Sequence, residues 1–244
     1  MKALFSFFFF LIALSSVGQQ NVEYTPEFVF REGIYLSFQD FKNNNPVPLT
    51  YILTDVDIRA SDYLWQVLNT DSIIYYDNTL EERVRPVNRI WGFCFNNKVH
   101  VGINTIEQSD RWEDRAWFPL ISIGAYSHFT AIISVTRYVP SSIGSMAYSG
   151  GFSMYDDPLF NNQGNYYQES VPIQMLLDFS NGEFIQLATG DLNSISPKLM
   201  VGLLQKDAVL RSEYVGKSGR KQKQSSLFYI RRFNQRNPIH FSTD

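Results

Sequence analysis

The amino-acid sequence predicts an α+β protein, mainly antiparallel β-sheet as a sandwich or an open barrel, with a helical segment at the C-terminus. Three observations lead to this prediction. Short runs of β-branched and aromatic residues are separated by turns rich in asparagine and glycine. Strands and helices do not alternate regularly, which argues against a parallel α/β sheet. After Asp191 the apolar residues recur at helical spacing instead.

The N-terminus has the order of features typical of a secretory signal. Lys2 supplies a positive charge, an apolar run covers residues 3–14, and small residues follow at Ser16 and Gly18. The apolar run is about a dozen residues long, whereas a bilayer span needs roughly 20. We therefore expect residues 1–18 to be a cleaved signal peptide. The mature protein would be exported to the periplasm or out of the cell.

The remaining 19–244 is expected to form a single globular domain, β-rich over 19–190 and helical and basic over 191–244. Apolar residues make up 44% of the chain, enough to bury a sizeable core. No apolar stretch after residue 18 is long enough to span a bilayer.

The β-rich part begins with a polar lead-in over 19–32, which we expect to be only partly ordered. A short strand at 33–36 precedes a helix at 38–43, where Ser37 and Asp40 resemble a capping box. Further β-like segments are expected at 51–58, 72–76, 118–123 and 129–139, and hairpins at 89–95 with 99–103 and at 173–179 with 183–188. Asparagine turns at 96–98 and Asn-Gly at 181–182 join the two hairpins.

The helical segment begins at Pro197, because proline suits the first turn of a helix. A further helical turn is expected near 209–210, and 216–219 is a break. The last helix is expected over 221–235 and ends before Asn237-Pro238.

Charge divides the chain into an acidic body and a basic end. Residues 191–244 hold ten basic and four acidic residues, a net charge of +6, and 19–190 has a net charge of −10. The basic side chains of the last helix could bind an anionic surface such as phospholipid or lipopolysaccharide; the candidates are Arg220, Lys221, Lys223, Arg231 and Arg232. Alternatively they form a solvated helix face, or dock on the acidic sheet of the same chain. An acidic exported protein does not suggest a nucleic-acid partner.

The long irregular stretch at 140–170 is the second candidate binding site. About thirty residues is long for a connection, and such loops are either functional or disordered. Its aromatic residues are interleaved with serine, glycine and asparagine, as in binding loops. The candidate ligand-binding residues are Tyr148, Phe152, Tyr155, Tyr166 and Tyr167. A glycan or an envelope protein would suit this composition; the alternative is an insertion without a ligand.

No catalytic or metal-binding set is predicted, and no cofactor. The three histidines, His100, His128 and His240, are far apart in sequence. Cys94 is the only cysteine and lies in an apolar strand, so it is expected in the core, although contact with His100 across the turn is open. Acidic residues gather at 55 and 57, 81–82, 110–114 and 156–157. Pairs of acidic residues are common on the solvent-exposed face of an antiparallel sheet, so they do not by themselves indicate catalysis.

Three motifs stand out along the mature domain, and the first and last lie near its two ends: 32–44 (EGIYLSFQDFKNN), 91–93 (WGF) followed by 96–98 (NNK), and 229–238 (YIRRFNQRNP). Together they resemble the pattern of uncharacterised exported proteins of the Bacteroidetes type. The resemblance implies export and a single domain, and it carries no activity or site residues.

The leading hypothesis is an exported, non-enzymatic binding or interaction domain. One alternative is an envelope hydrolase that cleaves glycan or peptide with carboxylates. The other is a structural subunit of the envelope, which predicts a large exposed apolar patch. The sequence leaves the oligomeric state open.

Overall fold

A computed structural model describes residues 21–60, 62–70, 73–77, 82–83, 90–105, 114–139, 165–190 and 195–242. The expected signal peptide, 1–18, lies outside these ranges. The elements in chain order are β1 (Asn21–Glu23), β2 (Gly33–Tyr35), α2 (Phe38–Lys42), the 3-10 helix η1 (Leu49–Tyr51), β3 (Ile52–Leu53), α3 (Tyr63–Leu68), β4 (Ile74–Asp77), β5 (Glu82–Arg83), β6 (Gly92–Phe95), β7 (Lys98–Asn104), β8 (Arg115–Pro119), β9 (Tyr126–Val139), β10 (Asn165–Asp178), β11 (Phe184–Thr189), α4 (Pro197–Leu203), the 3-10 helix η4 (Leu204–Lys206), α5 (Ala208–Val215), α6 (Gly219–Arg236) and β12 (His240–Ser242).

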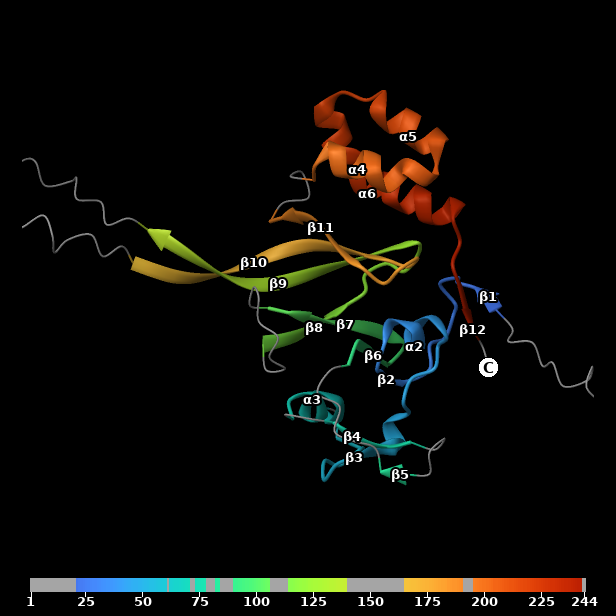
Figure 1. Cartoon of the computed structure of the whole chain (residues 1–244), viewed down its shortest axis with the longest axis vertical. Helices are drawn as coiled ribbons and strands as arrows, with labels where there is room; N and C mark the ends of the chain where they lie inside the picture. Colours follow the sequence, from blue (N-terminus) through green and yellow to red (C-terminus); the bar gives the residue numbers. More distant parts are fainter. Residues whose placement is uncertain are drawn as a thin grey trace, which may run out of the picture.

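The elements stack in layers, with helices α4 to α6 over one sheet and a second sheet beneath it (Figure 1). The upper sheet has the strand order β11-β10-β9, and the lower sheet has the order β2-β6-β7-β8. All described strand pairs are antiparallel, and these sheets do not close into a barrel. The predicted α+β class, with antiparallel sheet and a C-terminal helical segment, is confirmed.

The upper sheet is buried on both faces because neighbouring residues of a strand point to opposite sides. On β10, Leu176 packs into the apolar cluster beneath the helices, and Leu177 packs into the cluster shared with the lower sheet. Both side chains are fully buried. This sheet is therefore the centre of the fold.

Two of the predicted turns are confirmed by their backbone angles. Asn96 and Asn97 have φ of 51° and 56°, so they form the two-residue turn between β6 and β7 that asparagine tolerates. Gly182, with φ of 80°, lies in the turn between β10 and β11. The capping box of α2 also forms, because Ser37 and Asp40 bond to each other's backbone N–H groups.

The prediction of a partly ordered lead-in is wrong for residues 21–32. Strand β1 pairs with β12, so the two ends of the described chain lie together. Phe30 is buried in an aromatic cluster whose other members include Phe41, Trp91, Phe179 and Phe241. The aromatic side chains of the lead-in therefore hold it in place, although most of its other residues are polar.

Several other boundaries differ from the prediction. The strand expected over 51–58 ends at Leu53, because the chain turns directly after it, where the Thr54 hydroxyl accepts a hydrogen bond from the Val56 N–H. A second turn follows, in which Asp57 accepts from the Arg59 N–H. Helix α3, which the sequence did not suggest, packs Leu64 and Val67 beneath the lower sheet. Strand β8 covers 115–119 rather than 118–123, since its register is set by pairing with β7.

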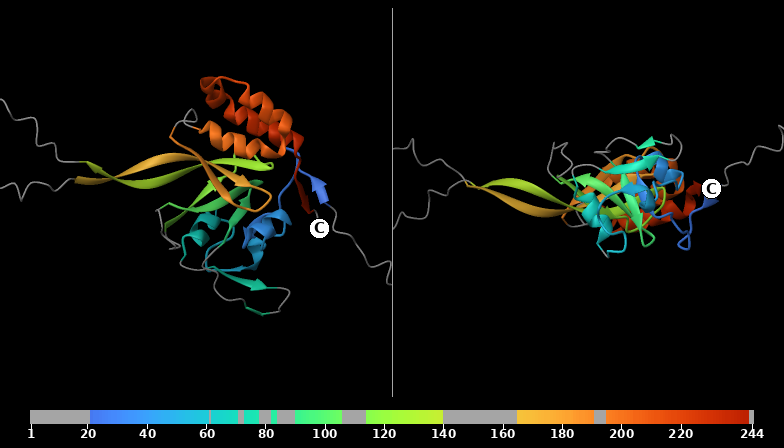
Figure 2. Two further views of the ribbon diagram at one scale, coloured as in Figure 1. Left: turned by 45° about the horizontal axis from the view of Figure 1, so that its top comes forward. Right: turned by 90° about the horizontal axis from the view of Figure 1, so that it is seen from below.

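Strands β9 and β10 form a long ribbon that projects from the layered body (Figures 1 and 2). Each has 14 residues, and they pair along their whole length. Strand β11 covers β10 only over Ile173–Leu177. The predicted irregular stretch, 140–170, therefore extends too far at its C-terminal end, because residues 165–170 form strand that pairs with residues 134–139.

Candidate functional sites: a basic helical layer and a projecting ribbon

The helical layer consists of α4, η4, α5 and α6, and its inner face is apolar. Ser196 precedes Pro197 at the start of α4, and the Asp207 carboxylate caps α5 by accepting from the Leu210 N–H at 3.0 Å. Helix α6 follows closely the predicted 221–235 and buries Tyr229, Ile230 and Phe233. The layer thus rests on the sheet through apolar side chains, and no ion pair joins its basic residues to the sheet residues that the structure describes.

The helical layer carries a strong positive charge. Residues 195–242 contain ten basic residues and two acidic ones, a net charge of +8. Both acids are ion-paired within the layer, Asp207 with Arg236 and Glu213 with Arg232. The hydrogen bond from Arg232 lowers the pKa of the Glu213 carboxyl below its usual range.

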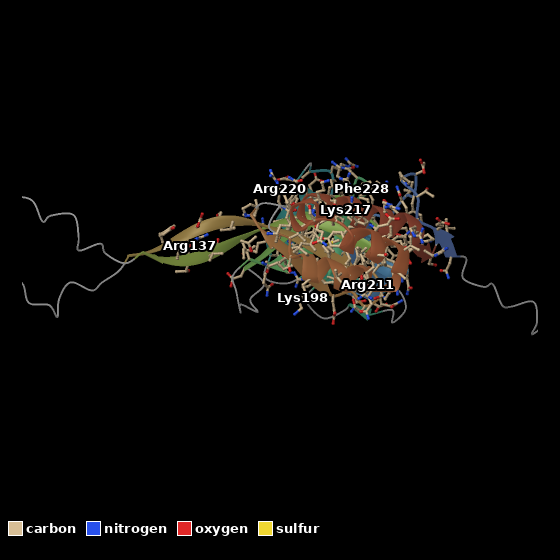
Figure 3. All side chains as sticks on the ribbon, turned by 90° about the horizontal axis from the view of Figure 1, so that it is seen from above. Arg137, Lys198, Arg211, Lys217, Arg220 and Phe228 are labelled. Carbon is tan, nitrogen blue, oxygen red and sulfur yellow. The ribbon has the colours of Figure 1, made fainter. Side chains whose placement is uncertain are left out.

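Eight basic side chains of this layer have no ion pair with an acidic side chain of the described residues. They are Lys198, Lys206, Arg211, Lys217, Arg220, Lys221, Lys223 and Arg231. All are exposed except Lys217, which is half-buried with its ammonium 5.7 Å from the centre of the Tyr229 ring. Seen from above, the labelled basic residues of the layer, Lys198, Arg211, Lys217 and Arg220, are spread across it (Figure 3). The layer therefore presents uncompensated positive charge to solvent.

An apolar side chain lies among these charges. Phe228 is 57% exposed, and the Arg232 guanidinium lies 5.7 Å from its ring centre. At 3.6 residues per turn, Lys221 and Arg231 lie within about 60° of Phe228 around α6, whereas Lys223 lies about 140° away. Four of the five predicted anionic-surface residues are thus exposed, and the fifth, Arg232, is held by Glu213.

Helix α5 adds two further exposed apolar residues to this layer. Val209 and Val215 are each 53% exposed. Basic side chains interspersed with exposed apolar ones are typical of segments that lie on an anionic membrane surface.

The ribbon holds the second candidate site only in part. Tyr148, Phe152 and Tyr155 lie outside the described residues. Tyr166 and Tyr167 lie on β10 rather than in a loop, and the Tyr167 side chain is 46% exposed.

Next to Tyr167 on the ribbon, Arg137 and Glu169 form an ion pair of 2.5 Å between strands β9 and β10. Tyr167 pairs with Arg137 in the strand register. Both charged side chains are about half exposed, at 53% and 43%. This projecting end of the ribbon is therefore a polar surface with one exposed aromatic ring.

The thiol of Cys94 and the imidazole of His100 do not form a catalytic pair. Cys94 pairs with Val99 and His100 with Phe93, so the two side chains point to opposite faces of the hairpin. Burial raises the pKa of the Cys94 thiol to about 12, and the His100 ring stacks on Phe93 at 4.6 Å. Cys94 is a core residue, as the sequence predicts.

The other polar candidates form no metal cluster within the described ranges. His128 Nε2 lies 2.9 Å from Gln174 Oε1, and His240 lies on β12. Asp55 and Asp57 are exposed in the turn after β3. Residues 81, 110–113 and 156–157 lie outside the described residues, so a carboxylate hydrolase remains a hypothesis.

Comparison of the chain with family models, curated proteins and solved structures gives no match. The resemblance to exported proteins of the Bacteroidetes type therefore remains a prediction. In the part of the chain that the structure covers, no helix combines the length and apolar character needed to cross a membrane.

Proposed function

We propose that this protein is an exported, non-enzymatic binding domain whose basic helical layer docks on an anionic lipid surface. The observation that supports the proposal is the group of eight basic side chains that have no acidic partner among the described residues, on a layer whose residues 195–242 have a net charge of +8. Each lysine or arginine close to an anionic membrane contributes about 1 kcal/mol of attraction. Phe228 would enter the headgroup region beside Lys221 and Arg231.

The arrangement of the layer supports this function over a purely structural role for its charges. Apolar side chains already hold the layer on the sheet, so the charges are not needed for docking within the chain. Like charges gathered on one small layer repel one another and destabilise it. An anionic surface would offset that repulsion.

The test is sedimentation of the mature chain with vesicles of phosphatidylcholine alone or mixed with phosphatidylglycerol. Binding is expected only to the anionic vesicles and should weaken with added salt. The double variant Lys221→Glu/Arg231→Glu should bind at least about tenfold more weakly. The matched control is Arg59→Glu/Lys98→Glu, which changes the net charge equally at exposed positions outside the helical layer. Equal loss in both variants, or equal binding to neutral vesicles, would overturn the proposal.

The ribbon favours a second function, contact with an envelope protein. Beyond Ser134, whose N–H donates to the Thr105 carbonyl, residues 135–139 and 165–169 pair only with each other among the described strands. An isolated two-stranded ribbon is only marginally stable in water, so a covering partner would stabilise it. A photo-crosslinker placed at Tyr167 should capture one protein in its native host, and one placed at Arg59 should not. Identical products from both positions would reject this function.

A further inference from the structure

A pocket of about 190 Å³ opens at the end of the upper sheet that lies opposite the projecting ribbon. It is bounded by the start of β9, the end of β10, the end of η4 and the segment that joins α6 to β12. This segment runs past the end of the sheet on its way down to β12 (Figure 1). All of the lining residues belong to the described part of the chain.

The apolar part of the lining comes from both of the clusters that cover the upper sheet. Phe233 belongs to the cluster beneath the helices, whereas Phe179 and Ile239 belong to the cluster shared with the lower sheet. Ala125 packs against both clusters, and its carbonyl accepts from the Phe179 N–H at 2.9 Å. An apolar cavity of about 150 Å³ accepts a benzene molecule, so this pocket has room for one apolar side chain.

Two side chains of opposite charge, Asp178 and Lys206, also line the pocket. They form no ion pair with each other or with another charged side chain of the described residues. Asp178 is held in place by Ser180, because its Oδ1 accepts from the Ser180 N–H at 2.8 Å and from the Ser180 hydroxyl at 2.7 Å. The described residues donate no hydrogen bond to its second oxygen, Oδ2. One positive and one negative group are therefore open to a ligand in the same pocket.

We propose that this pocket binds a free α-amino acid with an apolar side chain. Such a molecule carries an ammonium and a carboxylate group on one carbon, so it can pair with Asp178 and with Lys206 at the same time. A fatty acid would bring a second carboxylate towards Asp178, and an alkyl amine would bring a second ammonium group towards Lys206, and like charges repel. The apolar side chain would contact Phe179, Phe233 and Ile239.

The probe is L-leucine, titrated into the mature chain by calorimetry. The comparison ligands are isocaproic acid, which lacks the ammonium group, isoamylamine, which lacks the carboxylate, and L-asparagine, whose side chain has a similar shape but is polar. Leucine should bind at least about tenfold more tightly than each of them. The reason is that a hydrogen bond to a charged group and the burial of an apolar side chain each contribute about that factor.

Two substitutions test the two charges of the pocket. Asp178→Asn should weaken leucine binding by about fivefold or more, and it keeps an oxygen that can accept from Ser180. Lys206→Met should weaken it by about threefold or more, a smaller effect because Lys206 is exposed. The matched controls, Glu183→Gln and Lys198→Met, remove the same charges at exposed positions outside the pocket and should bind leucine as the parent does.

Circular dichroism establishes that each variant is folded before its binding is compared. Lys206→Met changes an exposed side chain and therefore serves if Asp178→Asn does not fold. The proposal would be overturned if leucine did not bind, if isocaproic acid or isoamylamine bound as tightly as leucine, or if a folded Asp178→Asn variant bound leucine as the parent does. The vesicle test changes Lys221 and Arg231, which lie outside the pocket, so this proposal and the lipid proposal can fail separately.

Discussion

The side-chain amide of Asn234 forms two hydrogen bonds with the backbone of Tyr126, 108 residues earlier in the chain. Its oxygen accepts from the Tyr126 N–H at 2.8 Å, and its nitrogen donates to the Tyr126 carbonyl at 2.9 Å. The amide packs against Gly124, where a Cβ atom would lie 2.5 Å from the Asn234 Cγ. This contact joins α6 to the start of β9 and fixes the helical layer on the sheet.

Replacement of Asn234 by alanine should lower the free energy of unfolding by about 2 kcal/mol, because two part-buried backbone groups lose their partners. Urea unfolding followed by circular dichroism measures the change. The control is Gln235→Ala on the exposed side of the same helix turn, which should change the midpoint little. Similar midpoints for the two variants would show that the contact does not hold the layer.

The second asparagine of the β6–β7 turn should matter more than the first. Asn97 accepts a hydrogen bond from the Phe30 N–H at 2.8 Å and donates one to the Phe28 carbonyl at 3.2 Å. Asn97→Gly keeps the turn but loses both bonds, at a cost of about 1–2 kcal/mol. Asn96→Gly should be nearly neutral, because the bond from Asn96 to Glu32 comes from its backbone N–H. Chemical denaturation compares the pair, and equal costs would contradict the assigned role of Asn97.

Cys94 should be inert in the folded protein. Its side chain is fully buried, and its pKa of about 12 leaves almost no thiolate at neutral pH. Reaction with Ellman's reagent should therefore be slow in buffer and rapid in guanidinium chloride. Non-reducing electrophoresis of the folded protein should show no covalent dimer. Rapid reaction of the native thiol would mean that β6 opens readily.

The stability of the protein should fall as the pH drops below about 6.5, the usual pKa of histidine in an unfolded chain. Burial lowers the pKa of His100 and of His128 in the folded protein. Between the lowered values and about 6.5 the unfolded chain binds more protons, so acidification favours unfolding. Above about pH 6.5 both histidines are neutral in the folded and in the unfolded chain, so they cause no loss of stability there.

Urea midpoints at about pH 7.5 and about pH 5.5 test this dependence. His100→Phe keeps a ring to stack on Phe93 and should reduce the difference between the two midpoints. His240→Gln, at an exposed position, should leave the difference unchanged. An unchanged difference in His100→Phe would exclude His100 as a source of the pH dependence.

The sequence by itself determined the features that depend on neighbouring residues. The capping box at Ser37, the turns at 96–97 and 181–182, and the helical spacing of Leu227, Ile230 and Phe233 all follow from local rules. Charge counting also located the basic segment without a structure. These signals were sufficient for the fold class.

Tertiary structure decided what depends on residues distant in the chain. Helix α3 and the buried lead-in form because they cover apolar surfaces of the lower sheet and of β12, which local patterns do not describe. The ion pair between Arg232 and Glu213 likewise joins α6 to α5. Asp40 of α2 lines the same pocket as Tyr75 and Tyr76 of β4. A periodic sequence pattern shows which face of a helix or strand is apolar, but only the packing of the folded chain determines which other element covers that face.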